Sequence, residues 1–595
     1  MEKIIDEILF SKHPAVEKLL KKVAYSIELS AQEHMAGALP EEALLKLIGR
    51  VVKEVRSFTE GQISHIYELV KIGLGLSSEK RIDRLLEMIV SEARRFTHAD
   101  GGTLYITSED GESLDFAIVQ NDSLGVFMGG SGERISWPSV PMRLADGRQN
   151  HGNVSAYCAL TGESVNIHDV YSAAGFDFQG TKDFDESTGY RSQSMLVIPL
   201  RDHEEEVIGV LQLLNAREKE TGKVVSFPEE EVEMVTSLAS EAAIALTNMR
   251  LVKGLENLLD AFVRTIGDAI DEKSPYTAGH IYRVSKLTSK LAQEVNRAGQ
   301  GIFAEVFFDE AELAEISMAA WLHDVGKITT PEFVMDKATK LETVLDRLEL
   351  VRLRVEIIKR DKIIARLSGS SSPDSEMLPD NEDEWSEILG FLAQVNLGSE
   401  GLSDQAVDRL KGLARHSYGV RGRSHPLLTA DEVENLCVRC GTLTEEERQV
   451  VNHHAEMTIR MLEQLPFPKK LRNVPAYAGM HHEKLAGSGY PRGLRAEQIP
   501  LPSRMIALAD ILDALTAVDR PYKAGKLLSE SLAILEKMVE QEELDGDLCD
   551  LAIESGVIVQ YAWETLPAEL VDDFIWRGKV YSVSGGQGSR GMEVK

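Results

Sequence analysis

Histidine and aspartate side chains that could bind metal ions recur in the C-terminal half of this 595-residue chain. One group is the adjacent pair His323-Asp324. Lys327 follows four residues after His323, so that it would lie on the same side of a helix. The other candidates are a second adjacent pair and residues that stand singly or one helical turn apart: His481-His482, His280, His454, Asp510 and Asp513.

These residue types point to a particular chemistry. Imidazole nitrogens and carboxylate oxygens together suit divalent ions such as Mn, Fe, Zn or Ni. Two such ions close together stabilise both the attacking hydroxide and the leaving oxygen when a phosphoryl group is displaced in line, and Asp324 could bridge them. No cysteine stands beside these histidines, which argues against a structural zinc site. The pattern therefore favours a metal-dependent reaction at phosphorus.

Ordered motifs surround these residues. His323-Asp324-Val325-Gly326-Lys327 fits H-D-x-G-K. Further along the chain, His481-His482-Glu483 is followed by Gly487-Ser488-Gly489-Tyr490-Pro491. The series is completed by Tyr276 to His280 with Arg283, Ile499 to Leu501, Ala509 to Thr516, and Asp519 to Lys523. Residues 271 to about 530 thus resemble the HD-GYP subfamily of HD-domain phosphohydrolases, on several motifs in the right order.

The resemblance implies an all-helical domain that cleaves cyclic di-GMP, or in some members cyclic GMP-AMP, to linear or mononucleotide products. It implies two divalent transition-metal ions, with Mn or Fe expected. Lys327 would contact or protonate the scissile phosphate region, and it and Asp324 would be the catalytic residues. The metal ligands, carried over position by position, would be His280, His323, Asp324, His454, His481, His482 and Asp510.

The same resemblance assigns the substrate side of the site. Arg520 and Lys523 would hold the substrate phosphates, a task that suits the bidentate arginine side chain. Arg283 and Tyr490 would also belong to this side, and Tyr490 would act by shaping the loop over the site. Asp513 would orient other groups rather than bind metal.

Three departures from the subfamily pattern matter. Tyr276 stands where some relatives have a glutamate that helps to hold a third metal, so two metals are expected. Ala486 replaces the usual aspartate before the G-x-G-Y-P loop, which could change loop order, rate or partner contacts. His454 comes 127 positions after Lys327, which indicates an insertion at about 337–444 that could be a lid, a dimer surface or a regulatory arm.

The elements upstream indicate a sensor. Residues 1–75 have helical apolar spacing and carry no catalytic constellation. Residues 76–250 combine helices with strands, including a hairpin over Ser194 to Leu214 preceded by Thr188 to Ser192, and so resemble a GAF domain. Such a domain implies an unknown small-molecule ligand, or a ligand-free dimerisation module. The fold class is therefore multidomain: an α+β sensor, a long connecting helix and an all-α catalytic domain.

A heptad pattern over residues 235–270 predicts the connecting helix. It includes Val235, Leu238, Ala242, Val263 and Ile270. Because this stripe lies between two domains, a parallel homodimer is expected along it, although burial within one domain is the alternative. A regulatory signal would run through this helix to the one that bears His280.

Composition and net charge restrict the classes of partner that the chain can bind. The net charge of −31 argues against a nucleic-acid polymer as partner, but not against a small anionic ligand held by metal ions and a few basic side chains. No apolar run is long enough to span a membrane. Four cysteines do not form a disulfide framework, and the cytoplasm is expected. The tail at 582–595, with four glycines, is expected to be disordered.

Two other functions stay open. The domain could be a catalytically weak or inactive receptor for a cyclic dinucleotide, or a partner-binding module, an alternative that Ala486 motivates. It could also be another HD-type nucleotide phosphohydrolase, against which Gly489-Tyr490-Pro491 and the segment from Arg520 to Lys523 argue.

Overall fold

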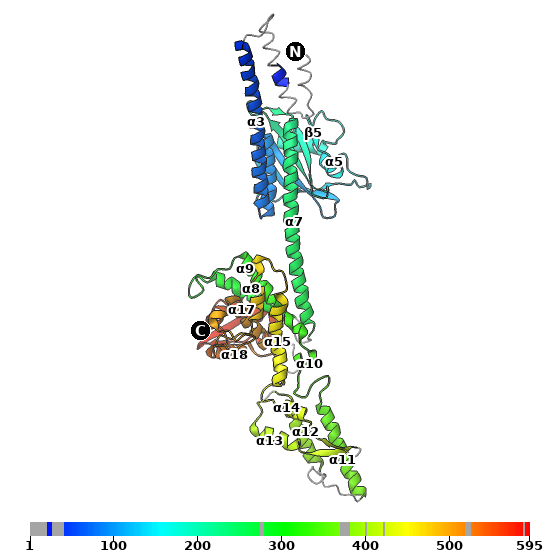
Figure 1. Cartoon of the computed structure of the whole chain (residues 1–595), viewed down its shortest axis with the longest axis vertical. Coiled ribbons are helices and arrows are strands. Elements are labelled where there is room, and N and C mark those ends of the chain that lie inside the picture. The colour runs from blue at the N-terminus through cyan, green and yellow to red at the C-terminus, as the bar shows by residue number, and fades with distance from the viewer. Residues whose placement is uncertain are drawn as a thin grey trace. The chain divides into compact units, whose positions relative to one another are not determined.

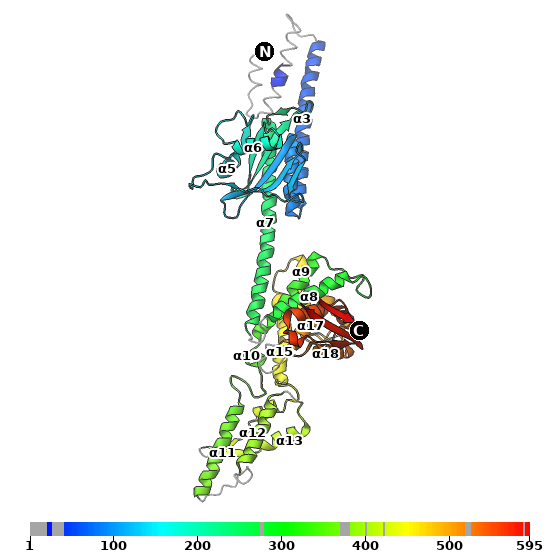
Figure 2. The same ribbon diagram turned by 180° about the vertical axis from the view of Figure 1, so that it is seen from behind.

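The computed structural model describes residues 21–25, 41–273, 279–368, 381–398, 401–420, 423–517, 525–586 and 589–594. The chain divides into two compact units, Met1–Glu256 and Asn257–Lys595. Figures 1 and 2 show the ribbon of the chain, and each unit has its own buried core.

The N-terminal unit is an α+β domain around one antiparallel sheet. Its strands follow the order β3-β2-β1-β7-β6-β5, with β4 paired to β2 and β8 paired to β7. Its elements are α3 (Glu41–Ser78), α4 (Ile82–Thr97), β1 (Ala99–Thr107), β2 (Ser113–Asn121), β3 (Val126–Gly129), β4 (Val140–Pro141), α5 (Val154–Thr161), β5 (Val165–Ile167), α6 (Gln179–Thr188), β6 (Met195–Arg201), β7 (Val207–Arg217), β8 (Val224–Val225) and the long helix α7 (Glu229–Asp271).

Both faces of this sheet are covered. Side chains of α3, α4 and α7 pack on one face, where Leu104 and Leu211 from the strands meet Leu85 and Leu238 from the helices. On the other face α5 and the loops near it cover a second apolar cluster. Alternating side chains of a strand point to opposite faces, so two buried layers require the nearly continuous apolar runs seen in β6 and β7.

Much of the predicted heptad stripe of α7 is buried inside the chain, and the homodimer expected along it stays a prediction. Val235, Leu238 and Ala242 are buried in the core of the N-terminal unit. Val263 and Ile270 are buried in the core of the C-terminal unit. The periodicity correctly indicated burial. These apolar side chains pack into the core of their own unit.

The C-terminal unit is mainly helical, as expected, with two small sheets in addition. Its elements up to residue 462 are α8 (His280–Arg297), α9 (Glu310–Leu322), η1 (Val325–Thr329), α10 (Glu332–Met335), α11 (Leu348–Ser368), α12 (Glu382–Asn396), α13 (Asp404–Leu413), β9 (Ser417–Val420), β10 (Arg423–Pro426), α14 (Ala430–Leu436) and α15 (Glu445–Leu462). The rest are η3 (Lys469–Leu471), α16 (Val474–Gly479), η4 (Ala496–Gln498), α17 (Leu501–Thr516), α18 (Leu528–Glu540), α19 (Gly546–Glu554), α20 (Val557–Thr565), η5 (Ala568–Leu570), β11 (Phe574–Trp576), β12 (Lys579–Gly586) and β13 (Ser589–Val594).

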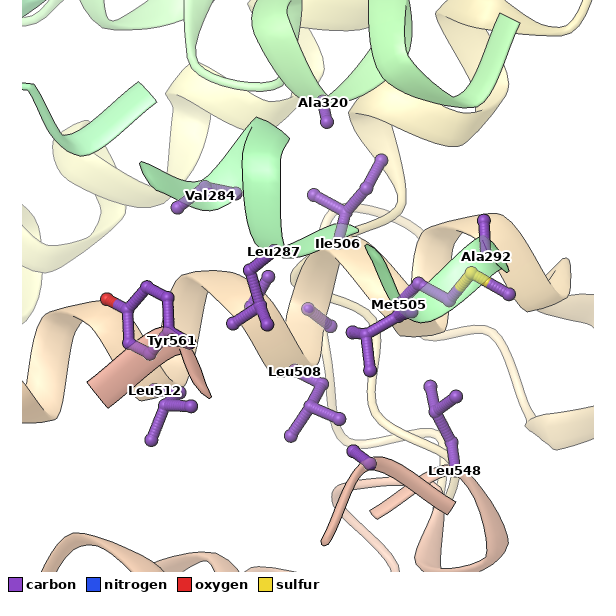
Figure 3. Close-up of a cluster of buried hydrophobic side chains, with 14 of the residues drawn as sticks. Val284, Leu287, Ala292, Ala320, Met505, Ile506, Leu508, Leu512, Leu548 and Tyr561 are labelled. Atoms are coloured by element: carbon purple, nitrogen blue, oxygen red, sulfur yellow. The ribbon is translucent and has the colours of Figure 1, made fainter. Parts of the chain in front are cut away.

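One hydrophobic core holds the helices that surround the site. Figure 3 shows Leu287 of α8, Ala320 of α9, Leu508 of α17 and Tyr561 of α20 gathered in it. Helix α17 is buried on most sides, because its sequence is apolar around the helix except for its few polar residues. A buried central helix gives its polar residues, Asp510 and Asp513, fixed positions.

The segment predicted to be an insertion has a separate core. Leu341, Val351, Trp385, Leu410 and Leu436 are among the side chains that pack together there. Its last helix, α14, and the returning helix α15 both begin with capping boxes, in which a threonine side chain and a glutamate three residues later satisfy free backbone N–H groups. The chain therefore re-enters the main core at a well-defined residue.

The glycine-containing tail does not follow the expectation of disorder. Strand β12 pairs with both β11 and β13, and its partners run from Tyr581–Val594 to Gly586–Ser589. Polar and glycine-rich composition predicted a solvated tail, but antiparallel pairing with a neighbour satisfies the backbone without a large apolar contribution. No described helix has a stretch that is both apolar and long enough to cross a membrane.

Candidate metal centre

Five segments bring the predicted ligands together. His280 is the first residue of α8, and His323 and Asp324 lie between α9 and η1. His454 lies in α15. The other ligands are His481 and His482, which follow α16, and Asp510, which lies in α17. The ligand atoms form two groups, His280-His323-Asp324 and His454-His481-His482, and within each group they lie within 4.8 Å of one another.

Backbone carbonyl groups orient three of the imidazole rings. The Nδ1 atoms of His323, His454 and His481 lie 2.8, 2.6 and 2.5 Å from the carbonyl oxygens three residues earlier in the chain. A hydrogen bond at Nδ1 sets the tautomer and leaves Nε2 free to bind a metal. The Nε2 atoms of His323 and His481 are buried without a hydrogen-bond partner among the described residues. Such orphaned acceptors fit a site made for a cation.

Asp324 lies between the two groups. Its Oδ2 is 3.3 Å from His323 Nε2 and 3.7 Å from His280 Nε2. Its Oδ1 is 3.5 Å from His454 Nε2 and has no hydrogen-bond partner among the described residues. Each carboxylate oxygen thus faces a different group of histidines, an arrangement suited to a ligand that joins two cations.

The remaining acids position His280. Asp513 Oδ2 lies 2.7 Å from His280 Nδ1, while Asp510 Oδ1 lies 3.2 Å from its Nε2. Asp513 is in turn held by Arg283, whose Nε and Nη2 donate at 2.7 and 3.1 Å, and by the Tyr561 hydroxyl, which donates at 2.5 Å. The guanidinium of Arg283 thus fixes Asp513, which orients His280; that Arg283 also binds substrate stays a prediction.

Burial and nearby charges shift the pKa values of the site's side chains in different directions. Burial would raise the pKa of Asp324, but Lys327, whose Nζ donates to Oδ2 at 2.5 Å, and His323 hold that pKa well below its usual range. Burial lowers the pKa of His481 and of His482, the latter to about 3. Burial would also lower the pKa of His280, but Asp510 and Asp513 outweigh it and raise the pKa to about 10.

Close packing joins the two ligand-bearing segments. The N–H of Gly326 donates to Thr458 Oγ1 at 3.0 Å, and this hydroxyl donates to the His323 carbonyl at 3.1 Å. A Cβ on Gly326 would lie 2.0 Å from the backbone oxygen of His454. Only glycine lets η1 approach α15 so closely. The H-D-x-G-K motif contained this signal, but its spacing could not say what the glycine contacts.

Sequence reasoning missed two supporting side chains. Lys273 Nζ donates to the carbonyl oxygens of Lys327, Ile328 and Thr330 at 2.9, 2.8 and 2.6 Å, so it holds the loop that carries Lys327. The carboxylate of Glu483, buried, accepts the N–H groups of Arg492 and Leu494 at 2.7 and 2.8 Å and closes the loop after His482. Residue type alone does not distinguish Lys273 from a surface lysine, whereas Glu483 stands in the motif that begins at His481, although that motif gave it no role.

The loop with Ala486 is ordered without an aspartate there. Ala486 is exposed, and its N–H donates to the Glu542 carbonyl at 2.8 Å. Across the loop, the Tyr490 ring lies 4.7 Å from the His482 ring, centroid to centroid, at an interplanar angle of 36°. Tyr490 therefore packs against His482, one of the predicted ligands.

The structure distinguishes the adjacent histidines His453 and His454 of α15. His454 is 2% exposed, whereas the side chain of His453 is 53% exposed and pairs with Glu456. His454, the predicted ligand, is thus the one of the two that lies beside His481 and His482. Tyr276, Arg520 and Lys523 lie outside the described residues.

Comparison with protein-family models finds a known domain in each of the two units. Models described as HD domain match residues 277–381 and 428–548, leaving 382–427 of the insertion unmatched between them, and a model described as GAF domain matches residues 81–246. The chain contains a GAF domain and an HD domain. Both candidate ligand groups lie within the residues that the two HD models match.

Curated relatives share the HD domain. The chain is 25% identical over 280 residues to 3′3′-cGAMP-specific phosphodiesterase 3 of Vibrio cholerae, and 36% identical over 135 residues to 3′3′-cGAMP-specific phosphodiesterase 1 of the same organism. It is 35% identical over 216 residues to a cyclic di-GMP phosphodiesterase of Thermotoga maritima. These matches cover 47%, 23% and 32% of this chain, and 35%, 30% and 58% of the relatives, less than two thirds in each case.

Proposed function

We propose that the chain is a cytoplasmic, metal-dependent phosphodiesterase of the HD-GYP type that hydrolyses a cyclic dinucleotide, with cyclic di-GMP as the first candidate, under the control of its GAF domain. The observation that carries this proposal is the position of Asp324, whose two oxygens face separate groups of buried histidines. Similarity to three cyclic dinucleotide phosphodiesterases supports the substrate class.

Two divalent ions, Mn or Fe, fit the donor set of neutral imidazoles and carboxylates. One would be held by His280, His323 and Asp324, the other by His454, His481, His482 and Asp324, with Asp510 on the side of His280. When bound, such ions would polarise the scissile phosphate and make a water molecule acidic enough to attack it near neutral pH.

The chain's own residues supply positioning and charge. Burial would lower the pKa of the Lys327 ammonium, but Asp324 raises it, so the side chain stays protonated. It can therefore stabilise the charge that develops on the phosphate and donate a proton to the leaving 3′ oxygen. Asp513 holds the ring of His280 through Nδ1. Arg520 and Lys523 would bind the phosphates of the substrate.

The experiment compares two neighbouring histidines. The purified chain is loaded with Mn or Fe(II), and cleavage of cyclic di-GMP and of cyclic GMP-AMP is followed by chromatography, for the wild type, His454→Ala and His453→Ala. The buried His454 is a proposed ligand, and the exposed His453 is the matched control. We expect His454→Ala to lose more than ~100-fold in rate, beyond what outer residues of metal sites usually contribute, and His453→Ala to keep wild-type activity.

Other results would change the assignment. Equal activity in both variants would remove His454 from the site. A wild type that binds metal and retains cyclic dinucleotide without cleaving it would favour the receptor function. In that case Ala486→Asp is the first variant to test, because this residue departs from the subfamily pattern in a loop that borders His482.

Metal binding should release a proton from His280. Because Asp510 and Asp513 raise the pKa of this ring to about 10, it is protonated at neutral pH, and it must lose the proton at Nε2 before that atom can bind a cation. His482, with its pKa lowered to about 3, is already neutral. Metal affinity should therefore rise with pH up to about 10, the pKa of His280. Titration calorimetry with Mn in buffers of different ionisation enthalpy should show release of about one proton per chain, and no buffer dependence would contradict the assignment.

Lys273 should matter for rate more than for folding. Lys273→Met removes the donor to three carbonyl groups of the loop that carries Lys327, so that loop should lose its fixed position. We expect kcat to fall by ~10–100-fold, the range for residues that orient a metal site, with the metal content kept and with partial recovery in Lys273→Arg. Steady-state kinetics, metal analysis and thermal unfolding test this, and wild-type kcat in Lys273→Met would refute it.

A further inference from the structure

A groove lies on the outer face of α8, away from the metal centre. It has a volume of about 330 Å³ and is bordered by side chains of α7, α8 and α9 that all belong to the C-terminal unit. Tyr282, Lys286 and Lys290 follow one another in steps of four residues, so they share one face of α8. His280 precedes Tyr282 by two residues, which is about 200° of helical rotation, and it therefore points to the opposite face.

The side chains that line this groove are cationic, aromatic or neutral. Its cations are Arg264, Lys286 and Lys290, and its rings are those of Tyr282 and Trp321. The other lining side chains are three serines and a glutamine, and no acid is among the described residues that line the groove. In a chain with a net charge of −31, this composition concentrates positive charge at one place, which attracts a small anion.

One carboxylate beside the groove holds both lysines in place. Glu564 of α20 lies 3.0 Å from Lys286 Nζ and 2.9 Å from Lys290 Nζ. Because two ammonium groups share a single negative charge, the pair stays net positive, and each ammonium keeps further N–H donors for a ligand. Arg264 pairs with Asp260, but these side chains are 50% and 57% exposed, so this ion pair is weak enough to be exchanged for a ligand.

The two rings provide a surface for a flat ligand ring. Tyr282 is 49% exposed, and its ring centroid lies 6.2 Å from that of Trp321. Trp321 is only 6% exposed, and the guanidinium carbon of Arg264 lies 5.1 Å from its ring centroid. Tyr282 is therefore the open platform of the groove, and Trp321 forms part of its wall. Aromatic side chains stack on any nucleobase, because every base has a π-face.

We propose that this groove is a second ligand site and that it binds a nucleoside monophosphate. The base stacks on Tyr282, and the phosphate accepts hydrogen bonds from Lys286 and Lys290, which lie one and two turns further along α8. The volume is at the lower end of the range for ligand pockets, which suits one base and one phosphate better than the two of each in a cyclic dinucleotide. The site goes beyond the proposed function and does not depend on it.

Titration calorimetry of the full chain with GMP tests the site. We expect the wild type to bind GMP, and guanosine and inorganic phosphate to bind at least ~10-fold more weakly, because each carries only one of the two recognised groups. Tyr282→Ala should weaken GMP binding by ~10-fold or more, with recovery in Tyr282→Phe, which keeps the ring. Lys286→Gln combined with Lys290→Gln should weaken it similarly. The matched control, Arg297→Gln, removes an exposed cation from the last turn of the same helix and should bind like the wild type.

Two further variants locate the bound GMP. Asp324→Asn alters the metal centre and should keep its affinity for GMP. Trp321→Phe keeps an aromatic ring but removes the tryptophan of the groove, so the quenching of tryptophan fluorescence by GMP should disappear while calorimetric binding remains.

Four results would overturn the proposal: a wild type that does not bind GMP, phosphate that binds as tightly as GMP, GMP affinity that is unchanged in both groove variants, or GMP binding that is lost in Asp324→Asn. Quenching that persists in Trp321→Phe would likewise place the nucleotide elsewhere. None of these readouts measures hydrolysis, so failure of this site is distinguishable from failure of the proposed function.

Discussion

Asp324→Asn is expected to abolish hydrolysis of a cyclic dinucleotide, with a fall in kcat/KM of at least ~10³-fold, the upper range for one preorganised electrostatic contact. Asparagine keeps the size of the side chain but replaces one oxygen with an NH₂ group and removes the negative charge. The oxygen facing His454 and the oxygen facing His280 and His323 cannot then both act as anionic ligands.

The same variant should lose metal. With the charge gone, the buried ammonium of Lys327 loses its partner at Oδ2, and two cations lose their shared ligand. Metal analysis after gel filtration should show less than the wild-type content, while Glu456→Gln, an exposed acid in α15, should keep both metal and activity. An Asp324→Asn protein with normal metal content and turnover would rule out the proposed role of this residue.

Gly326→Ala is expected to give the largest loss of stability among single methyl additions near the site. The new Cβ would lie 2.0 Å from the His454 oxygen and 2.6 Å from the Thr458 nitrogen, both backbone atoms. A flexible side chain cannot relieve such contacts, so η1 and α15 would have to separate. Overpacking costs about 1–3 kcal/mol and occasionally more, and we expect the upper end of this range.

The damage should reach the metal centre, because η1 follows Asp324 directly and α15 carries His454. A loss of about 3 kcal/mol corresponds to a fall in the midpoint of thermal unfolding of roughly 6–12 °C for a domain of this size, and Mn affinity should weaken with it. The matched control is Gly390→Ala in α12, where nothing lies within 4 Å and alanine favours the helix. Equal unfolding temperatures in wild type and Gly326→Ala would contradict the steric argument.

The chemistry of the site could be predicted from the sequence because it resides in adjacent residues. A His-Asp pair, a His-His pair and a lysine one turn away carry their identity in the covalent chain, and the described structure brings His280, His323, Asp324, His454, His481, His482 and Asp510 to one centre. Helical periodicity likewise located α7 and the helical C-terminal unit, because burial of one face leaves a repeat in the sequence.

Tertiary packing alone decided which partner each group meets. Arg283 is basic and stands in a motif, yet its guanidinium is held by Asp513, which lies 230 residues further along the chain. Lys273 resembles any surface lysine until three carbonyl groups converge on it. In α7, one apolar face is buried in the cores of the two units and the adjacent apolar face is exposed. The sequence could not show which of the two faces would be buried. Periodicity records that a face is apolar, whereas the identity of its partner depends on contacts between residues far apart in the chain.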